Sequence, residues 1–382
     1  MNDGGRKDTD TTPNFIPDLV SGLTRKKYSA LRDVCVRAVI GEGPSRNPER
    51  AVFTGGLSGL GKTTMVDMVL RLIVDGVIDA NDLRLFHPRY PEYMNEYGSE
   101  MARDLTRDFC DLLAVDIQNE ALIRRRSFVR EGTLQLPITC IPEAMQAATS
   151  GRDVIIAVLV GQAGDEELGR HHRHWEMRGD KERLALTDAA AARLSFVREI
   201  EHTYDDARAQ SSILFTLSRI EEGLKDHALK APGRNERIPA HRIIVIGTDG
   251  DIKYVNDFSD PARQTRSWEA CAAEYDRPRR PQETDRLSAR VVRTRALMHN
   301  FGANDKEWLV FQRLVDHRLA RSLPGSHTAR PQRELARMEE GVAPKFDPVS
   351  VWNMKVTEKL KEIMERPAVI AAAPQAVPAE KS

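Results

Sequence analysis

The stretch Gly56-Leu57-Ser58-Gly59-Leu60-Gly61-Lys62-Thr63 decides the fold of this chain. It fits the pattern GxxxxGK[ST], in which backbone N–H groups wrap around phosphates and the next helix presents its positive N-terminal end. Lys62 can reach the β and γ phosphates of ATP or GTP, and the Thr63 hydroxyl can hold Mg²⁺. The pattern therefore predicts a phosphate-binding loop whose ligand-binding residues are Gly56, Ser58, Gly59, Leu60, Gly61, Lys62, Thr63 and Thr64.

The flanking sequence predicts strands that alternate with helices. An apolar strand pattern at 51–54 precedes the loop and a helical pattern at 63–73 follows it. Further strands are predicted at 76–79, 127–130, 154–160, 242–246 and 252–255, and the last two flank a glycine turn typical of a hairpin. Helices are predicted at 18–40, 93–125, 143–149 and 165–229. This order indicates an α/β fold of the P-loop NTPase type, with a parallel sheet flanked by helices.

Composition divides the chain into four parts. Residues 1–17 are polar and 367–382 are rich in alanine and proline, so we expect disordered tails. Between them we predict a P-loop kinase domain over 18–258 and a helical extension over 259–366. The extension follows a basic, proline-containing stretch and has helical patterns at 284–298, 305–323 and 349–364.

Charge and hydropathy exclude several classes of protein. Lys plus Arg equals Asp plus Glu, 57 against 57, so no overall positive field draws the chain onto nucleic acid. The N-terminus lacks a signal-peptide pattern, and the longest apolar run, Val154–Val160, is far shorter than the ~20 residues that span a bilayer. The four cysteines form no CxxC pair. We expect a cytoplasmic protein without a membrane or nucleic-acid partner.

Polar side chains follow the second and third predicted strands. Asp79, Asn81 and Asp82 come after one, and Glu131 comes after the other. Ligands of parallel sheets lie beyond the carboxyl ends of the strands, and a kinase needs a carboxylate beside the acceptor hydroxyl. These residues are therefore candidates for the acceptor site.

With these features the sequence resembles the zeta-toxin kinases of bacterial toxin and antitoxin systems. Those are P-loop enzymes that phosphorylate UDP-N-acetylglucosamine with ATP and Mg²⁺. The resemblance covers about residues 18–258. The motifs that carry it are residues 56–64, residues 77–84 with His87-Pro88 and Tyr90, residues 128–133, and the hairpin around Gly250.

The resemblance implies roles for particular residues. Glu131 and Thr133 are similar to the pair that contacts the sugar-nucleotide acceptor, and Asp116 joins them from the preceding helix. Arg173 falls where the family has an arginine that stabilises the transferring phosphoryl group, and Arg183 is the candidate for a second. An antitoxin protein is the partner that the resemblance implies.

The sequence departs from the family at the acceptor-activating aspartate. Counting back from His87-Pro88, that position is Asn81, whose amide cannot take a proton from a hydroxyl. Either Asp82 or Asp79 serves instead, with Asp82 as our candidate catalytic carboxylate, or catalysis is weak or lost. Two alternatives to a nucleotide-sugar kinase stay open: a kinase of the same fold for an antibiotic or nucleoside, and a nucleotide-binding interaction protein with degenerate catalysis.

Overall fold

The computed structural model describes most of the chain. The described residues are 23–43, 45, 49–184, 206–228, 240–258, 266–319 and 354–365. The two predicted tails and part of the helical prediction over 165–229 lie outside them.

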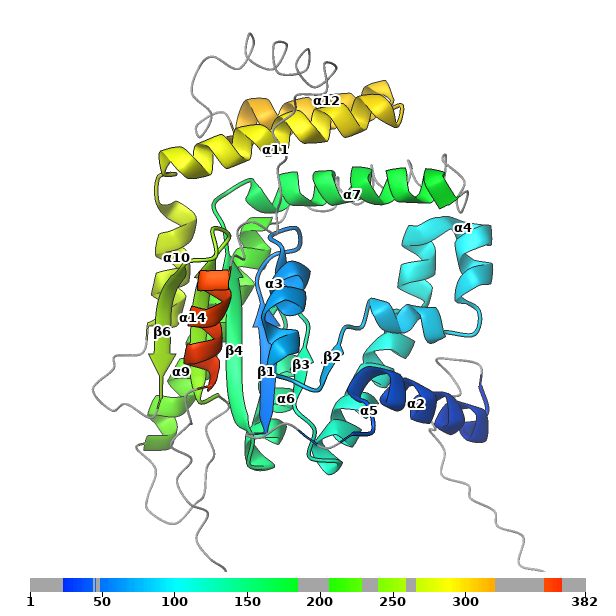
Figure 1. Ribbon diagram of the computed structural model, residues 1–382, viewed down its shortest axis with the longest axis vertical. Helices are drawn as coiled ribbons and strands as arrows, with labels where there is room; N and C mark the ends of the chain where they lie inside the picture. The colour runs from blue at the N-terminus through cyan, green and yellow to red at the C-terminus, as the bar shows by residue number, and fades with distance from the viewer. Residues whose placement is uncertain are drawn as a thin grey trace, which may run out of the picture.

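A six-stranded sheet forms the centre of the molecule (Figure 1). Its order is β2-β3-β1-β4-β5-β6, in which all neighbours are parallel except β5 and β6. The bounds are β1 Arg50–Gly55, β2 Gly76–Ile78, β3 Phe128–Arg130, β4 Asp153–Val160, β5 Arg242–Gly247 and β6 Ile252–Asp257. The predicted α/β fold with a mostly parallel sheet is confirmed, as is the final hairpin.

Helices cover both faces of the sheet, because the central strands are buried along their whole length. Every residue of β1, β4 and β5 is buried, which requires packing on both faces. The helices before the sixth strand are α2 Arg25–Ile40, α3 Lys62–Met68, α4 Tyr90–Leu105, α5 Arg107–Ile123, α6 Pro137–Thr149, α7 Asp165–Leu184 and α9 Asp206–Ala228. After it come α10 Ser267–Asp276, α11 Pro281–Asn300, α12 Asp305–Arg313 and α14 Met354–Glu365.

The packing of these helices places the carboxyl edge of the sheet under α7. Helix α6 packs on β1 and β4, α10 packs on β4, β5 and β6, and α5 packs on β2 and β3. In Figure 1, α3 and α14 lie in front of the sheet, and α7 and α11 cross above it. The P-loop connects β1 to α3 on the side of the sheet that faces α7.

Two predicted helices are interrupted in the structure. The prediction over 93–125 becomes α4 and α5, and α4 is itself kinked at Gly98, where φ is 78° and ψ is 176°. The prediction over 63–73 becomes α3 followed by a short 3₁₀ helix, Leu70–Leu72. Helix α10 was not predicted. Its buried apolar residues are only Cys271 and Tyr275, and they follow a proline-containing stretch.

The helices of the extension pack on the sheet and on α7. Cys271 and Tyr275 of α10, with Leu360 of α14, belong to the main core. A second apolar cluster joins α7 to α11, α12 and the π-helical turn Leu314–Leu319; it comprises Leu168, Trp175, Leu287, Val291, Met298, Phe311, Leu314, Val315 and Leu319. In the described part of the chain, no helix combines the length and apolar character needed to span a bilayer.

Candidate active site

Lys62 is buried inside the P-loop. Its Nζ donates hydrogen bonds to the carbonyl oxygens of Gly56 and Leu57, both at 3.0 Å, and the side chain is 9% exposed. Burial lowers the pKa of Lys62 to about 8, while the charge of Glu131 opposes this shift and that of Arg173 adds to it. The loop therefore holds a buried cation bonded to its own backbone carbonyls. A phosphate bound in the loop would meet this cation.

Thr63 and Glu131 meet directly. Thr63 Oγ1 donates a hydrogen bond of 3.0 Å to Glu131 Oε1, which joins the start of α3 to the end of β3. The N–H of Glu131 donates to Ile78 O at 2.9 Å, so the carboxyl end of β2 fixes the backbone of Glu131. Burial raises the pKa of Glu131, the Asp79 charge adds to this, and the Thr63 hydrogen bond partly reverses it.

The donor set of this pair fits Mg²⁺. Mg²⁺ prefers oxygen ligands at about 2.0–2.1 Å in octahedral geometry, so adjacent ligand oxygens lie about 2.9 Å apart. The 3.0 Å between the Thr63 and Glu131 oxygens is close to that separation. Thr63 and Glu131 are thus suited to hold the cation that would bridge the phosphates of a bound nucleotide.

The segment after β2 carries three candidate side chains, Asp79, Asn81 and Asp82, which differ in their hydrogen bonds and exposure. Asp79 Oδ1 accepts hydrogen bonds from the backbone N–H of Asn81 at 2.8 Å and from Asn81 Nδ2 at 3.0 Å. Arg84 Nη1 donates to Asn81 Oδ1 at 2.6 Å. Desolvation and then the charge of Asp79 raise the pKa of Asp82, although Asp82 is largely exposed. Asn81 therefore acts locally as a hydrogen-bonding bridge, and Asp79 and Asp82 are the carboxylates of this segment.

Helix α7 brings arginines to the P-loop through a close backbone contact. An added Cβ at Gly169 would lie 2.0 Å from Gly59 O, so only glycine allows this approach. Arg170 Nη1 donates to Ser58 O at 3.2 Å, and the positive charges of Arg173 and Arg170 both lower the pKa of Lys62. Sequence reasoning did not single out Arg170; its position one residue after Gly169 was the available signal.

The other predicted acceptor residues lie at different distances from this centre. Thr133 follows Glu131, and its carbonyl accepts a hydrogen bond of 3.3 Å from the N–H of Gly56. Asp116 on α5 accepts a 2.9 Å hydrogen bond from Tyr28 Oη of α2, so its carboxylate takes part in the packing of those two helices. Arg183 belongs to the last turn of α7, and its side chain is outside the described residues. These three assignments stay predictions.

The opposite face of α7 rests on the extension. Trp175 is fully buried in the second cluster. His172 Nδ1 lies 3.0 Å from Thr294 Oγ1 of α11, and Arg178 forms an ion pair of 3.5 Å with Glu307 of α12. One helix thus carries arginines toward the P-loop on one side and is held by α11 and α12 on the other.

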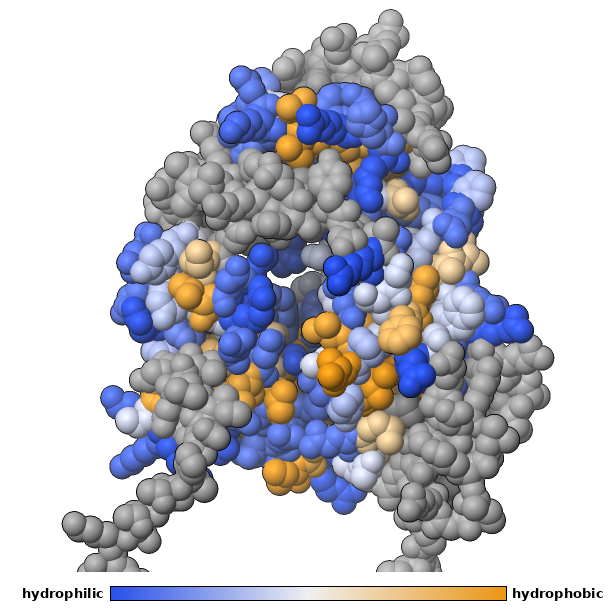
Figure 2. Space-filling model, turned by 180° about the vertical axis from the view of Figure 1, so that it is seen from behind, coloured by the Kyte–Doolittle hydropathy of each residue, from blue (hydrophilic) through white to orange (hydrophobic). Residues whose placement is uncertain are grey.

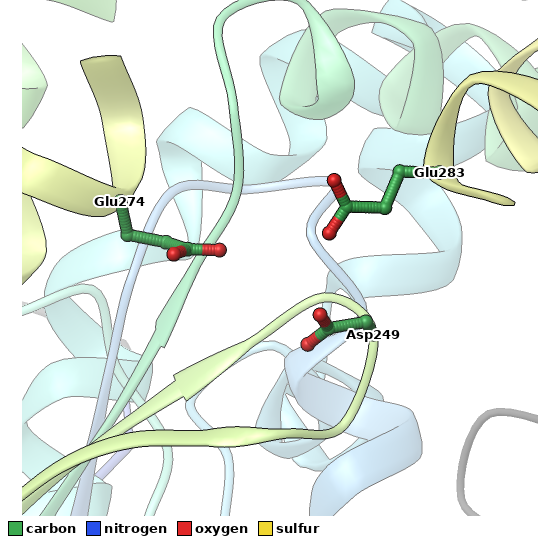
Figure 3. A group of neighbouring side chains, drawn as sticks. All are labelled: Asp249, Glu274 and Glu283. Atoms are coloured by element: carbon green, nitrogen blue, oxygen red, sulfur yellow. The ribbon is translucent and has the colours of Figure 1, made fainter. Parts of the chain in front are cut away.

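A cluster of three carboxylates beside the hairpin is an ion-pair network rather than a metal site. Figure 3 shows Asp249 of the β5–β6 turn, Glu274 of α10 and Glu283 of α11 facing one another. Three cations share them, namely Lys253, Arg277 and Arg280. Burial alone would raise the pKa of Glu283, but hydrogen bonds from the two arginines lower it. The network fastens the start of the extension to the hairpin.

These features define a P-loop fold of the kinase type. Residues 39–211 match the zeta toxin family model, so this part of the chain is similar to the zeta-toxin family. The resemblance seen in the sequence is thereby confirmed.

Individual relatives agree with this family. Toxin PezT of Streptococcus pneumoniae serotype 4 (strain ATCC BAA-334 / TIGR4) is 29% identical over 122 residues, which are 31% of this chain. The match spans 47% of PezT, so the chain covers about half the length of this curated relative.

Two solved structures are similar to this chain. A structure from the characterisation of the PezAT chromosomal toxin-antitoxin system of Streptococcus pneumoniae has a TM-score of 0.56 at 17% identity. It covers 73% of this chain and 99% of that chain, and this likeness supports the fold. A structure of the AvrRxo1-ORF1:-ORF2 complex has a TM-score of 0.42 at 12% identity, covering 76% of this chain and 88% of that chain.

Proposed function

We propose that this chain transfers the γ-phosphoryl group of ATP to a hydroxyl of a nucleotide sugar, with UDP-N-acetylglucosamine as the first candidate acceptor. The contact between Thr63 and Glu131 carries the proposal, because it joins the cation-binding end of the P-loop to the carboxyl end of β3. Lys62 would meet the β and γ phosphates, and Thr63 and Glu131 would hold a Mg²⁺ ion, which would offset phosphate charge. Arg173, and Arg183 by the family resemblance, neutralise charge on the transferring group.

The acceptor lies on the side of the P-loop occupied by β2 and β3. The molecule is hollowed near the middle of the reverse view in Figure 2. The charge of Asp79 raises the pKa values of Asp82 and Glu131, and the charge of Asp82 also raises that of Glu131, so these carboxylates lie near one another. Glu131 and Thr133 orient the acceptor, and a carboxylate after β2 takes its proton.

Asp79 is the stronger candidate for this proton acceptor. Its charge raises the pKa values of Lys62, Glu131 and Asp82, which indicates that it lies near all three. Asn81, at the position where the family has its aspartate, donates its amide to Asp79 and so holds that carboxylate in place. Phosphoryl transfer depends mainly on positioning and electrostatics, so an amide at position 81 is compatible with turnover.

The names of the relatives favour a toxin that is held inactive by a protein partner. PezT is named a toxin, and the structure at a TM-score of 0.56 comes from a toxin-antitoxin system. We extend both properties to this chain as part of the proposal. Co-expression with a gene product encoded beside it tests the partner directly, since growth should recover only when the two proteins co-purify.

An acceptor panel tests the reaction. Purified protein with Mg²⁺ and ATP is offered UDP-N-acetylglucosamine, other nucleotide sugars, nucleosides and aminoglycosides, and ADP release is measured. Stimulation by nucleotide sugars alone supports the proposal. Stimulation by nucleosides or antibiotics points to the small-molecule kinase, and ATP binding without stimulation by any acceptor points to the interaction protein.

A further inference from the structure

A small pocket lies beside the P-loop, under the first turns of α11. Its volume is about 80 Å³. The P-loop contributes Leu60, and α11 contributes Arg286 and Leu287. A single water needs about 10–15 Å³ measured in this way, so the pocket has room for a planar ring.

The pocket lies where a nucleotide bound at the P-loop has to extend. Gln162 and Thr248 line it, and they follow the carboxyl ends of β4 and β5. Neighbouring strands are about 4.8 Å apart, so the end of β5 lies about 10 Å from the end of β1. Three carboxylates also line this pocket, namely Asp165, Asp249 and Glu283, and each is paired with a cation, Arg279, Lys253 and Arg277 respectively.

The inner wall of the pocket is closely packed and combines methyl groups with the carboxylate of Asp165. An added Cβ at Gly161 would lie 2.7 Å from Leu60 Cδ2 and 3.0 Å from Thr248 Cγ2. The side chains of Leu60 and Thr248 therefore both pack against Gly161, where any larger residue would clash with them. Leu60 and Thr248 present methyl groups, which suit the face of an aromatic base.

The outer wall contains an arginine without a partner. Arg279, near the start of α11, is occupied, because it donates to Asp165 Oδ1 at 2.7 Å and to Ala163 O at 3.1 Å. Arg286 lines the pocket, is exposed, and has no hydrogen-bond or ion-pair partner among the described residues. A guanidinium group in this position can stack on a base or bond its acceptor atoms.

We propose that this pocket binds the base of a purine nucleoside triphosphate and that α11 supplies its outer wall through Arg286 and Leu287. The inference rests on the proposed function, because it assumes that the triphosphate lies on the P-loop. It gives the helical extension, which lies beyond the matched family region 39–211, a direct role in binding the nucleotide.

Calorimetry with two ligands tests the pocket apart from the P-loop. Mg-ATP contacts both sites, whereas Mg-tripolyphosphate contacts the P-loop alone. Arg286→Ala should weaken Mg-ATP binding about 5-fold to 100-fold, the range for loss of one base contact, and leave tripolyphosphate binding unchanged. Thr248→Phe, which fills the pocket, should have the same pattern. Arg313→Ala is the matched control, since Arg313 is an exposed arginine of α12 outside the pocket.

The outcomes separate the two proposals. If both variants bind Mg-ATP as tightly as the parent protein while Lys62→Ala loses both ligands, the base lies elsewhere and the pocket proposal is overturned. If the parent protein binds neither ligand, the P-loop proposal fails and takes the pocket proposal with it.

Discussion

Gly59 of the P-loop and Gly169 of α7 touch backbone to backbone. A Cβ on Gly169 would lie 2.0 Å from the carbonyl oxygen of Gly59, a distance at which the main chain itself must move. The contact fixes α7 against the loop and so sets the position of Arg170 and Arg173 relative to Lys62. Catalysis of phosphoryl transfer depends mainly on the accurate positioning of such charged groups.

Gly169→Ala should therefore reduce turnover far more than nucleotide affinity. We expect kcat to fall about 100-fold, as for a displacement of about 1 Å, with the Kd for Mg-ATP within about threefold. Gly43→Ala is the control, because a Cβ there meets nothing within 4 Å. A Gly169→Ala protein with the parent's kcat would show that the contact has no catalytic consequence.

The lowered pKa of Lys62 predicts weaker nucleotide binding in alkaline solution. Burial brings this pKa to about 8 from an ordinary value of 10.5, so the free protein loses the positive charge as the pH rises past about 8. Affinity for Mg-ATP should fall by up to about tenfold for each further pH unit. Lys62→Arg keeps its charge throughout and should bind with an affinity that is flat from pH 7 to 10, as calorimetry in matched buffers can establish.

Asp79 and Asp82 can be separated by paired substitutions. Asp79→Asn keeps an oxygen for the N–H of Asn81 but cannot accept a proton, so turnover should fall about 100-fold to 10,000-fold. Asp82→Asn should cost less than about tenfold, because Asp82 is exposed and acts mainly through its charge. The reverse order of effects would assign the base to Asp82.

The second apolar cluster should support α7 from behind. Phe311→Ala removes a fully buried ring and should cost about 3–5 kcal/mol of the free energy of unfolding. Hydrogen exchange should rise in α7 and α11, and kcat should fall more than the affinity for Mg-ATP. Phe215→Ala on α9, where the ring is 55% exposed, is the matched control. Unchanged exchange in α7 would mean that α11 and α12 do not hold it.

Sequence patterns predicted the parts of this structure that depend on local chemistry. The Gly56–Thr63 match predicts a loop between a strand and a helix, and the apolar run Val154–Val160 predicts the buried strand β4. Both predictions are confirmed. Helix α10 escaped prediction because it contains no Leu, Ile, Val or Met at helical spacing, and of its apolar residues only Cys271 and Tyr275 are buried. The kink at Gly98 depends on a positive φ that a sequence pattern does not encode.

The site was harder to predict, because its geometry depends on contacts between distant segments. Thr63 and Glu131 were both candidates, but their direct hydrogen bond required the pairing of β1, β3 and β2. Arg170 acquires its place from the Gly59–Gly169 contact, and the pocket under α11 requires the fold of the extension. Of these relationships, only that of Arg170 left a signal in the sequence, namely its position one residue after Gly169.

The most direct test of the account is the fate of the γ-phosphoryl group. The protein is incubated with γ-labelled ATP, Mg²⁺ and UDP-N-acetylglucosamine, and the products are separated and identified by phosphorus NMR. The account predicts a labelled nucleotide sugar with one new phosphomonoester, absent with Lys62→Ala and strongly reduced with Glu131→Gln. Label that stays in ATP or appears only as inorganic phosphate, with every nucleotide sugar tried and with nucleotide binding verified, would contradict it.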